Sequence, residues 1–194
     1  MNNKLLKKLS NIFGYKLVEK SLIKNNQIIS KNSSLNLRLV LDNIFKKNKI
    51  DSLIQIGAND GIAFDEVNFF IKRYKIESIL VEPIIENFNK LQNNYKNHEF
   101  VKLENSAISD ENTINYLYKV DTKFLDHYGN HIPAISSFDK NHLIKHGVKN
   151  SHIKKVKINS LTINDLLNKY KLNKLDLIFV DAEGYDGNIV YDLL

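Results

Sequence analysis

The sequence predicts an α/β fold with a doubly wound, mostly parallel sheet. From Asp51 onward, apolar runs of strand length alternate with amphipathic stretches of helix length. Such alternation is typical of parallel strands joined by right-handed crossovers. The first apolar run, residues 52–56, also ends at a turn bracketed by Gly57 and Gly61. Glycines in such a turn allow the backbone to approach a ligand closely.

The residues before this region predict helices. Apolar residues recur at helical spacing over residues 4–13 and 36–45, and a polar linker at 24–34 separates the two stretches. The lysine-bearing first stretch could lie on a membrane surface or pack against the rest of the protein. We therefore expect an N-terminal helical extension over residues 1–50 and an α/β domain over residues 51–194.

The domain begins with a regular alternation of strand and helix. The first elements expected are strands at 53–56, 78–82 and 100–104, with helices at about 64–74 and 85–95. A further strand at 114–120 and a long polar segment interrupt the alternation, and together they indicate an insert over about 112–152. The alternation then returns with a strand at 154–158, a helix at about 162–170, a strand at 176–180 and a last helix from Gly187.

Composition narrows the function classes. The 194 residues are 43% hydrophobic and can bury one sizeable core. The absence of cysteine excludes disulfides and thiolate chemistry, and it fits a cytoplasmic location. No stretch approaches the roughly 20 apolar residues of a membrane span. The net charge is +6, but the lysines are spread along the chain and only Arg38 and Arg73 are arginines, so no nucleic-acid partner is expected.

The turn after the first strand predicts a nucleotide-type cofactor. Its spacing is G-x-x-x-G over residues 57–61, without the third glycine of the dinucleotide fingerprint. Glu82 ends the second strand, where a carboxylate can accept hydrogen bonds from both ribose hydroxyls. A glycine turn alone is common in α/β proteins of any function. Together with Glu82, it favours a cofactor without a pyrophosphate.

Four segments carry a resemblance to a known family. They are Gly-Ala-Asn-Asp-Gly at 57–61, Glu-Pro at 82–83, Asn-Ser-Ala-Ile-Ser-Asp at 105–110 and Val-Asp-Ala-Glu-Gly-Tyr-Asp at 180–186. In this order they resemble the FkbM family of S-adenosylmethionine-dependent methyltransferases, from about Asp51 to the C-terminus. Asp186 stands where the family more usually has glutamate, which keeps the charge. The resemblance implies a Rossmann-like class I methyltransferase fold with S-adenosylmethionine as cofactor.

The resemblance also implies roles for single residues. The cofactor-binding residues would be Gly57, Asn59 and Gly61 at the methionine end, Glu82 at the ribose, and Ser106 and Ala107 beside the adenine. Small residues suit the close approach of the backbone to the methionine group.

Asp181 and Glu183 are the candidate catalytic residues. Asp181 ends the strand beside the switch point, where it could contact the positive end of the cofactor or the acceptor hydroxyl, or cap the following helix. Glu183 could accept the proton that a hydroxyl acceptor loses. No proline follows Asp181, unlike in enzymes that methylate exocyclic base nitrogens, so an oxygen acceptor is favoured.

The histidines offer two pairs at i, i+4 spacing, which can place two metal ligands on one helical face. The pair His127 and His131 straddles a glycine, and the pair His142 and His146 lacks the glutamate of a zincin motif. No metal site is therefore predicted. A histidine of the insert could instead act as base or contact the acceptor.

The sequence thus favours methylation of a hydroxyl on a sugar, glycan or secondary metabolite. The alternative is a noncatalytic α/β protein that binds a cofactor or depends on a partner. A complete domain of this type continues with further strands after the helix at Gly187, so we expect a chain truncated at its C-terminus. The strand at 176–180 would then be an unpaired edge.

Overall fold

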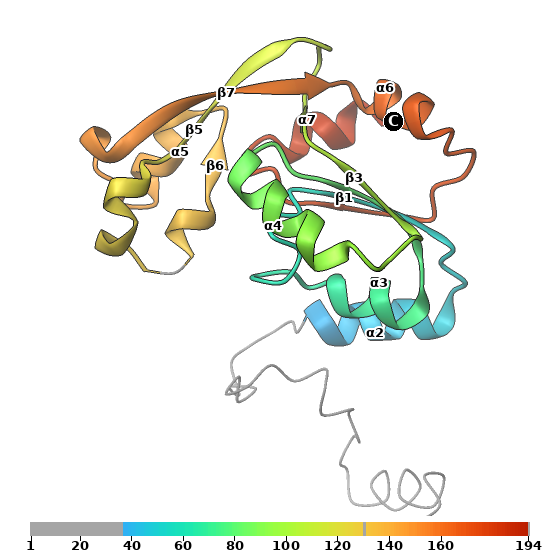
Figure 1. Cartoon of the computed structure of the whole chain (residues 1–194). Helices are drawn as coiled ribbons and strands as arrows, with labels where there is room; N and C mark the ends of the chain where they lie inside the picture. The colour runs from blue at the N-terminus through green and yellow to red at the C-terminus, as the bar shows by residue number, and fades with distance from the viewer. Residues whose placement is uncertain (1–36, 130, 194) are drawn as a thin grey trace, which may run out of the picture. The chain divides into compact units, whose positions relative to one another are not determined.

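The computed structural model describes residues 37–129 and 131–193 (Figure 1). The expected helix at 4–13 and the linker at 24–34 lie outside these residues. The chain divides into two compact units, residues 1–49 and 50–194. In the first unit, helix α2 (Leu37–Lys47) forms where the sequence predicts a helix. Its last turn carries Lys46 and Lys47, whose charges favour a helix C-terminus.

The second unit is built on a sheet of four parallel strands. Their order is β3 (Val101–Glu104), β2 (Glu77–Val81), β1 (Ser52–Ile56) and β8 (Leu177–Val180). The chain runs outward from β1 through β2 to β3 and then returns to the other side of β1 to form β8. This reversal between β1 and β8 is the switch point of a Rossmann-like sheet, so the predicted doubly wound fold is confirmed.

Helices cover both faces of this sheet. Helices α6 (Ile163–Tyr170) and α7 (Asp186–Tyr191) pack through buried apolar side chains on the face that carries Ile54 and Ile79. Figure 1 shows α3 (Asn68–Tyr74) and α4 (Ile85–Tyr95) on the other face. Each buried apolar side chain contributes about 1.5–3 kcal/mol. The double cover explains why every residue of β1 is buried.

Helix α3 begins later than the apolar pattern suggests. The sequence predicts a helix from about residue 64, but α3 starts at Asn68. Phe64 has a left-handed backbone with φ of 59°. The Asp65 carboxylate then accepts hydrogen bonds from the N–H groups of Val67 and Asn68, both at 2.8 Å. This side-chain turn supplies acceptors for the first N–H groups and delays the helix.

A second sheet of four strands is formed by the part of the chain between β3 and β8. Its order is β4 (Ala107–Ile108), β7 (Ile153–Leu161), β5 (Ile114–Val120) and β6 (Ser136–Ser137). Strands β5 and β7 are antiparallel along all of β5, from Ile114 opposite Asn159 to Val120 opposite Ile153. The strand expected at 154–158 therefore belongs to this ladder and not to the main parallel sheet.

The insert has an apolar core of its own. Val120, Ile132, Ile135, Leu143 and Val148 are buried together. They join β5 and β6 to short helices, namely η2 (Thr122–His127), η3 (Ile132–Ala134), α5 (Lys140–Lys145) and η4 (Asn150–His152). Figure 1 shows α5 and β6 at the end of the β5–β7 ladder. Although residues 121–151 are mostly polar, this segment therefore forms a packed subdomain.

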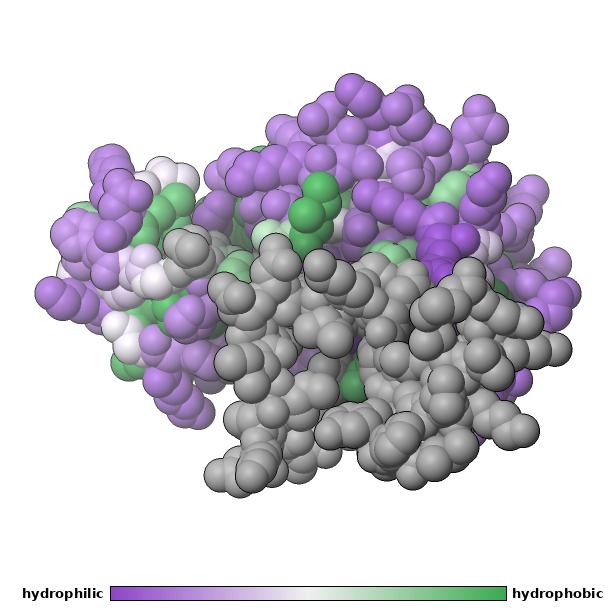
Figure 2. All heavy atoms as spheres, turned by 90° about the horizontal axis from the view of Figure 1, so that it is seen from below, coloured by the Kyte–Doolittle hydropathy of each residue, from purple (hydrophilic) through white to green (hydrophobic). Residues whose placement is uncertain are grey.

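The face of the molecule that Figure 2 shows is mainly polar where its atoms are not grey, with hydrophobic side chains in small groups. Exposed apolar side chains are common on proteins. Among the helices of residues 37–193, none has both the length and the apolar character needed to cross a membrane.

The position of Gly57 gives a test of the fold. Gly57 has φ of +80°, and a Cβ atom there would lie 2.0 Å from the carbonyl oxygen of Asp181. Gly147 has φ of +86°, but a Cβ atom there would meet nothing within 4 Å. In urea unfolding, Gly147→Ala should cost about 1–2 kcal/mol, the price of a left-handed backbone alone. Gly57→Ala should cost at least about 2 kcal/mol more. Equal losses would contradict the close contact between β1 and β8.

Candidate functional site

A cavity of about 320 Å³ opens at the carboxyl ends of the central strands. Its lining includes the turn after β1, Glu82 after β2, Ser106 after β3, and Asp181 and Glu183 after β8. The insert contributes further lining residues, among them Ile135 and His146. Ligands of open α/β sheets bind at this edge, beside the switch point. The topology therefore brings the sequence-predicted residues of four separate segments to one place.

Backbone hydrogen bonds fix the turn after β1. The N–H groups of Gly57 and Ala58 both donate to the carbonyl oxygen of Val81 at 3.0 Å. The N–H of Gly61 donates to Ala58 at 2.8 Å. Asn59 has φ of 51°, a left-handed conformation that asparagine tolerates better than most residues. Gly57 and Asn59 line the cavity, as their predicted role requires.

Gly61 has a different position. It is not among the residues that line the cavity. A Cβ atom at Gly61 would lie 2.6 Å from side-chain atoms of both Leu91 and Tyr95 on α4. The Asn68 side chain donates to the Gly61 carbonyl and to the Tyr95 hydroxyl. Gly61 thus allows the turn to pack closely on α4, whereas the sequence predicts that it lines the methionine end of a cofactor.

Glu82 is a buried carboxylate that faces the cavity. Its residue surface is only 4% exposed. One carboxylate oxygen accepts the N–H of Asn59 at 2.9 Å, and the other accepts the N–H of Ile84 at 2.8 Å. Burial raises the pKa of Glu82 to about 7, and these hydrogen bonds act in the opposite direction. The Asn87 side chain donates a further hydrogen bond to this carboxylate. A carboxylate has about four acceptor sites, so Glu82 can still accept a hydrogen bond from a ligand hydroxyl.

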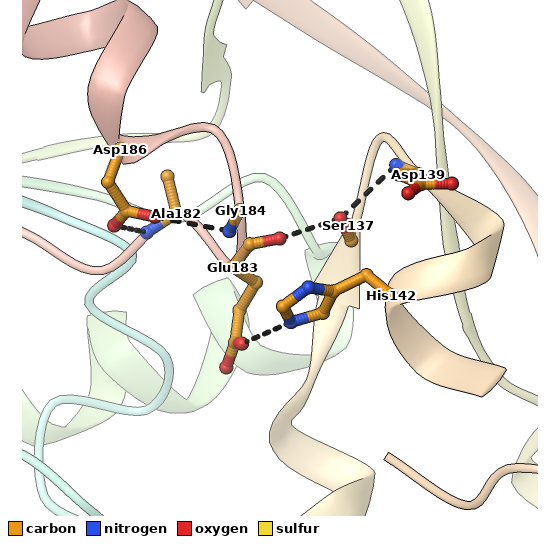
Figure 3. Close-up of polar contacts among 7 residues, drawn as sticks. All are labelled: Ser137, Asp139, His142, Ala182, Glu183, Gly184 and Asp186. Atoms are coloured by element: carbon orange, nitrogen blue, oxygen red, sulfur yellow. Dashed lines mark hydrogen bonds and ion pairs between the residues drawn. The ribbon is translucent and has the colours of Figure 1, made fainter. Parts of the chain in front are cut away.

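The segment after β8 is held by Asp186. Its carboxylate accepts hydrogen bonds from the N–H groups of Ala182 at 2.9 Å and Gly184 at 3.1 Å (Figure 3). The capping role considered for Asp181 is wrong, because the N-cap residue of α7 is Tyr185 and no side chain caps this helix. The N–H of Asp181 donates to Ile56 at 3.0 Å, and its side chain lines the cavity. Partial burial and the charges of Glu183 and Asp186 raise the pKa of Asp181.

Glu183 contacts the insert in two ways. Its carbonyl oxygen accepts a hydrogen bond from the Ser137 hydroxyl at 2.7 Å, and its carboxylate lies 3.0 Å from Nε2 of His142 (Figure 3). Gly184 makes this contact possible, because a Cβ atom there would lie 3.2 Å from Nδ1 of His142. The sequence predicts a role for Glu183 but does not predict its contacts with Ser137 and His142. The spacing of His142 and His146 was the available signal.

Comparison with protein families agrees with this arrangement. The family model described as Methyltransferase FkbM domain matches residues 55–191, from β1 to the end of α7. The protein belongs to the FkbM methyltransferase family. The resemblance found in the sequence is thereby confirmed. Searches of curated proteins and of solved structures gave no significant match.

A methyltransferase of the FkbM family needs a methyl donor, and the cavity has polar groups suited to one. The hydroxyl oxygen of Ser106 and the side-chain oxygen of Gln55 are buried and have no hydrogen-bond partner among the residues that the structure describes. Both residues line the cavity, as does Ala107. Buried polar atoms normally have partners, so these two fit contacts with a polar ligand. With Glu82, they form a polar lining that suits a nucleoside.

The raised pKa of Glu82 predicts a dependence of stability on pH. Between its ordinary value of 4.5 and about 7, the folded protein binds more protons at this site than the unfolded chain does. The contribution of Glu82 to the free energy of unfolding should therefore fall as pH rises through this window. Urea unfolding of the FkbM protein and of Glu82→Gln at pH 4.5, 6 and 7.5 checks this. The variant should gain stability relative to wild type as pH rises, and a constant difference would contradict the raised pKa.

Proposed function

We propose that the protein is an S-adenosylmethionine-dependent methyltransferase that methylates a hydroxyl of a sugar, glycan or secondary metabolite. The observation that carries this proposal is the buried Glu82 carboxylate beside the unpartnered side-chain oxygens of Ser106 and Gln55. All three line one cavity at the switch point of a methyltransferase-family domain. When bound, S-adenosylmethionine would supply an electrophilic methyl group on a positively charged sulfur.

Different lining residues would contact the ribose, the adenine and the methionine group of this donor. Glu82 would accept hydrogen bonds from the ribose hydroxyls, and Ser106 and Ala107 would contact the adenine. Gly57 and Asn59 would lie beside the methionine group. Asp181 adds a negative charge at the same edge, which favours a ligand with a positive amino group and sulfur.

Glu183 and His142 suit the acceptor side. A hydroxyl must lose its proton as its oxygen bonds to the methyl carbon and the carbon–sulfur bond breaks. The Glu183 carboxylate would receive this proton, and His142 at 3.0 Å holds the carboxylate in place. The insert residues Ile135 and Phe138 line the same cavity and would position the acceptor. Alignment of this kind is the main contribution that the protein makes to a displacement reaction.

Binding of the cofactor product tests the donor site. Calorimetric titration with S-adenosylhomocysteine should give one site per chain. Glu82→Gln should weaken binding at least about 10-fold, because hydrogen bonds to a charged group contribute about 1.5–3 kcal/mol. The control is Glu77→Gln, which changes the exposed residue at the other end of β2. Absence of binding to folded protein, or equal affinity in both variants, would refute the donor site.

Transfer of a labelled methyl group tests the reaction. Glu183→Gln should lower transfer from S-adenosylmethionine to a glycan pool about 100-fold or more, which is the usual contribution of a general base. Its affinity for S-adenosylhomocysteine should remain within about 2-fold. Asp192→Asn alters an exposed carboxylate after α7 and serves as control. Cofactor binding without transfer in the wild-type chain would favour a noncatalytic cofactor-binding protein.

A further inference from the structure

Three side chains that can bind a metal meet at the rim of the cavity. They are His142 and His146 from the insert and Glu183 from the segment after β8. One ligand atom from each lies within 4.8 Å of the other two. The rings of His142 and His146 have centroids 4.7 Å apart. The sequence predicts no metal site because this histidine pair lacks a nearby glutamate, but the fold supplies Glu183 from 41 residues away along the chain.

The local structure orients the two histidines. Helix α5 begins after Asp139, whose carboxylate accepts the N–H of Asn141 at 2.8 Å. It ends at Lys145, and the N–H of the C-cap residue His146 donates to the carbonyl oxygens of His142 and Leu143. Leu143, between the two histidines, is fully buried in the core of the insert. One turn of helix therefore presents both imidazoles on one side, and the buried leucine fixes which side that is.

The local backbone also orients the carboxylate of Glu183. Glu183 has a left-handed backbone with φ of 48°, and Gly184 follows with φ of 99°. The hydrogen bonds from Ser137 to the Glu183 carbonyl and from Gly184 to Asp186 fix this unusual turn (Figure 3). A left-handed backbone is strained at a residue other than glycine, and at Glu183 it persists because the surroundings determine it. Its effect here is to direct the Glu183 side chain toward His142.

The chemical character of these three side chains determines which kind of metal ion they can bind. Two neutral imidazoles and one carboxylate are ligands for divalent transition-metal ions, whereas Mg²⁺ and Ca²⁺ prefer oxygen. Bonds of about 2.0–2.2 Å place the ligand atoms of a tetrahedral site about 3.3–3.6 Å apart. The pair His142 Nε2 and Glu183 Oε2, at 3.0 Å, is already close to this spacing, and small rotations of the exposed His146 would complete it. We propose that His142, His146 and Glu183 bind one divalent transition-metal ion such as Zn²⁺.

The place of this site gives it a role in the proposed reaction. Glu183 and His146 line the cavity, so the open coordination position of a three-ligand site would face the acceptor. A bound ion there would bind an acceptor oxygen and lower the pKa of its hydroxyl. Glu183 would bind the ion through one carboxylate oxygen, and its other oxygen would accept the proton of the acceptor hydroxyl. This role rests on the proposed function and favours acceptors with a second oxygen beside the reacting hydroxyl, such as vicinal diols.

Metal binding can be tested without cofactor or acceptor. The full chain is treated with chelator, dialysed and titrated with ZnCl₂ in a calorimeter, and Co²⁺ is added separately to record its visible absorption. We expect one Zn²⁺ per chain and the intense bands of tetrahedral Co²⁺. MgCl₂ should give no binding at this site.

Variants identify the ligands. His146→Ala and Glu183→Gln should each weaken Zn²⁺ binding at least 10-fold and reduce the Co²⁺ bands. The control is His127→Ala, which removes an exposed histidine of the other i, i+4 pair and should leave both readouts unchanged. Circular dichroism verifies that each variant is folded. No stoichiometric Zn²⁺ binding, or binding that survives both ligand variants, would overturn the inference. Because no cofactor is present, either result is independent of the proposed methyl transfer.

Discussion

A buried carboxylate connects the two loops on which the cavity depends. Glu82 lies at the carboxyl edge of the sheet. Its carboxylate accepts one hydrogen bond from the N–H of Asn59 in the turn after β1 and another from the N–H of Ile84 at the start of α4. Charge at a buried site is costly, and here that cost raises the pKa of Glu82 to about 7. The hydrogen bonds offset part of the cost and position the turn. Because Gly57 in the same turn approaches the Asp181 carbonyl, the ends of β1, β2 and β8 are held in one arrangement.

The two halves of the site have different physical origins. The half around Glu82 is formed by the parallel sheet, so its geometry follows from strand order and from the glycine that lets two strand ends approach. The other half depends on the β5–β7 ladder and on the insert core around Leu143, which carry His142 to Glu183. A donor site on the sheet and an acceptor site on the insert would allow the acceptor to vary while the donor site stays the same.

The sequence predicts the strands of the main sheet well, because a strand buried on both faces leaves a short apolar run bounded by turns. It does not predict the partner of β7, since alternation of strands and helices says nothing of which sheet a strand joins. The sequence does not show where α3 begins, because its start depends on the left-handed backbone of Phe64 and on the Asp65 carboxylate, which accepts the first N–H groups. Glu82 is recognisable from its position at a strand end, and Ser106 from the resemblance to the family. The cluster of His142, His146 and Glu183 is not, because only tertiary packing brings them together.

The central claim is that the cavity beside Glu82 binds the methyl donor. A crystal structure of the chain with S-adenosylhomocysteine tests it most directly. The account predicts both ribose hydroxyls within hydrogen-bonding distance of the Glu82 carboxylate, with the adenine beside Ser106 and Ala107. A nucleoside bound elsewhere, with no contact to the Glu82 carboxylate, would contradict it.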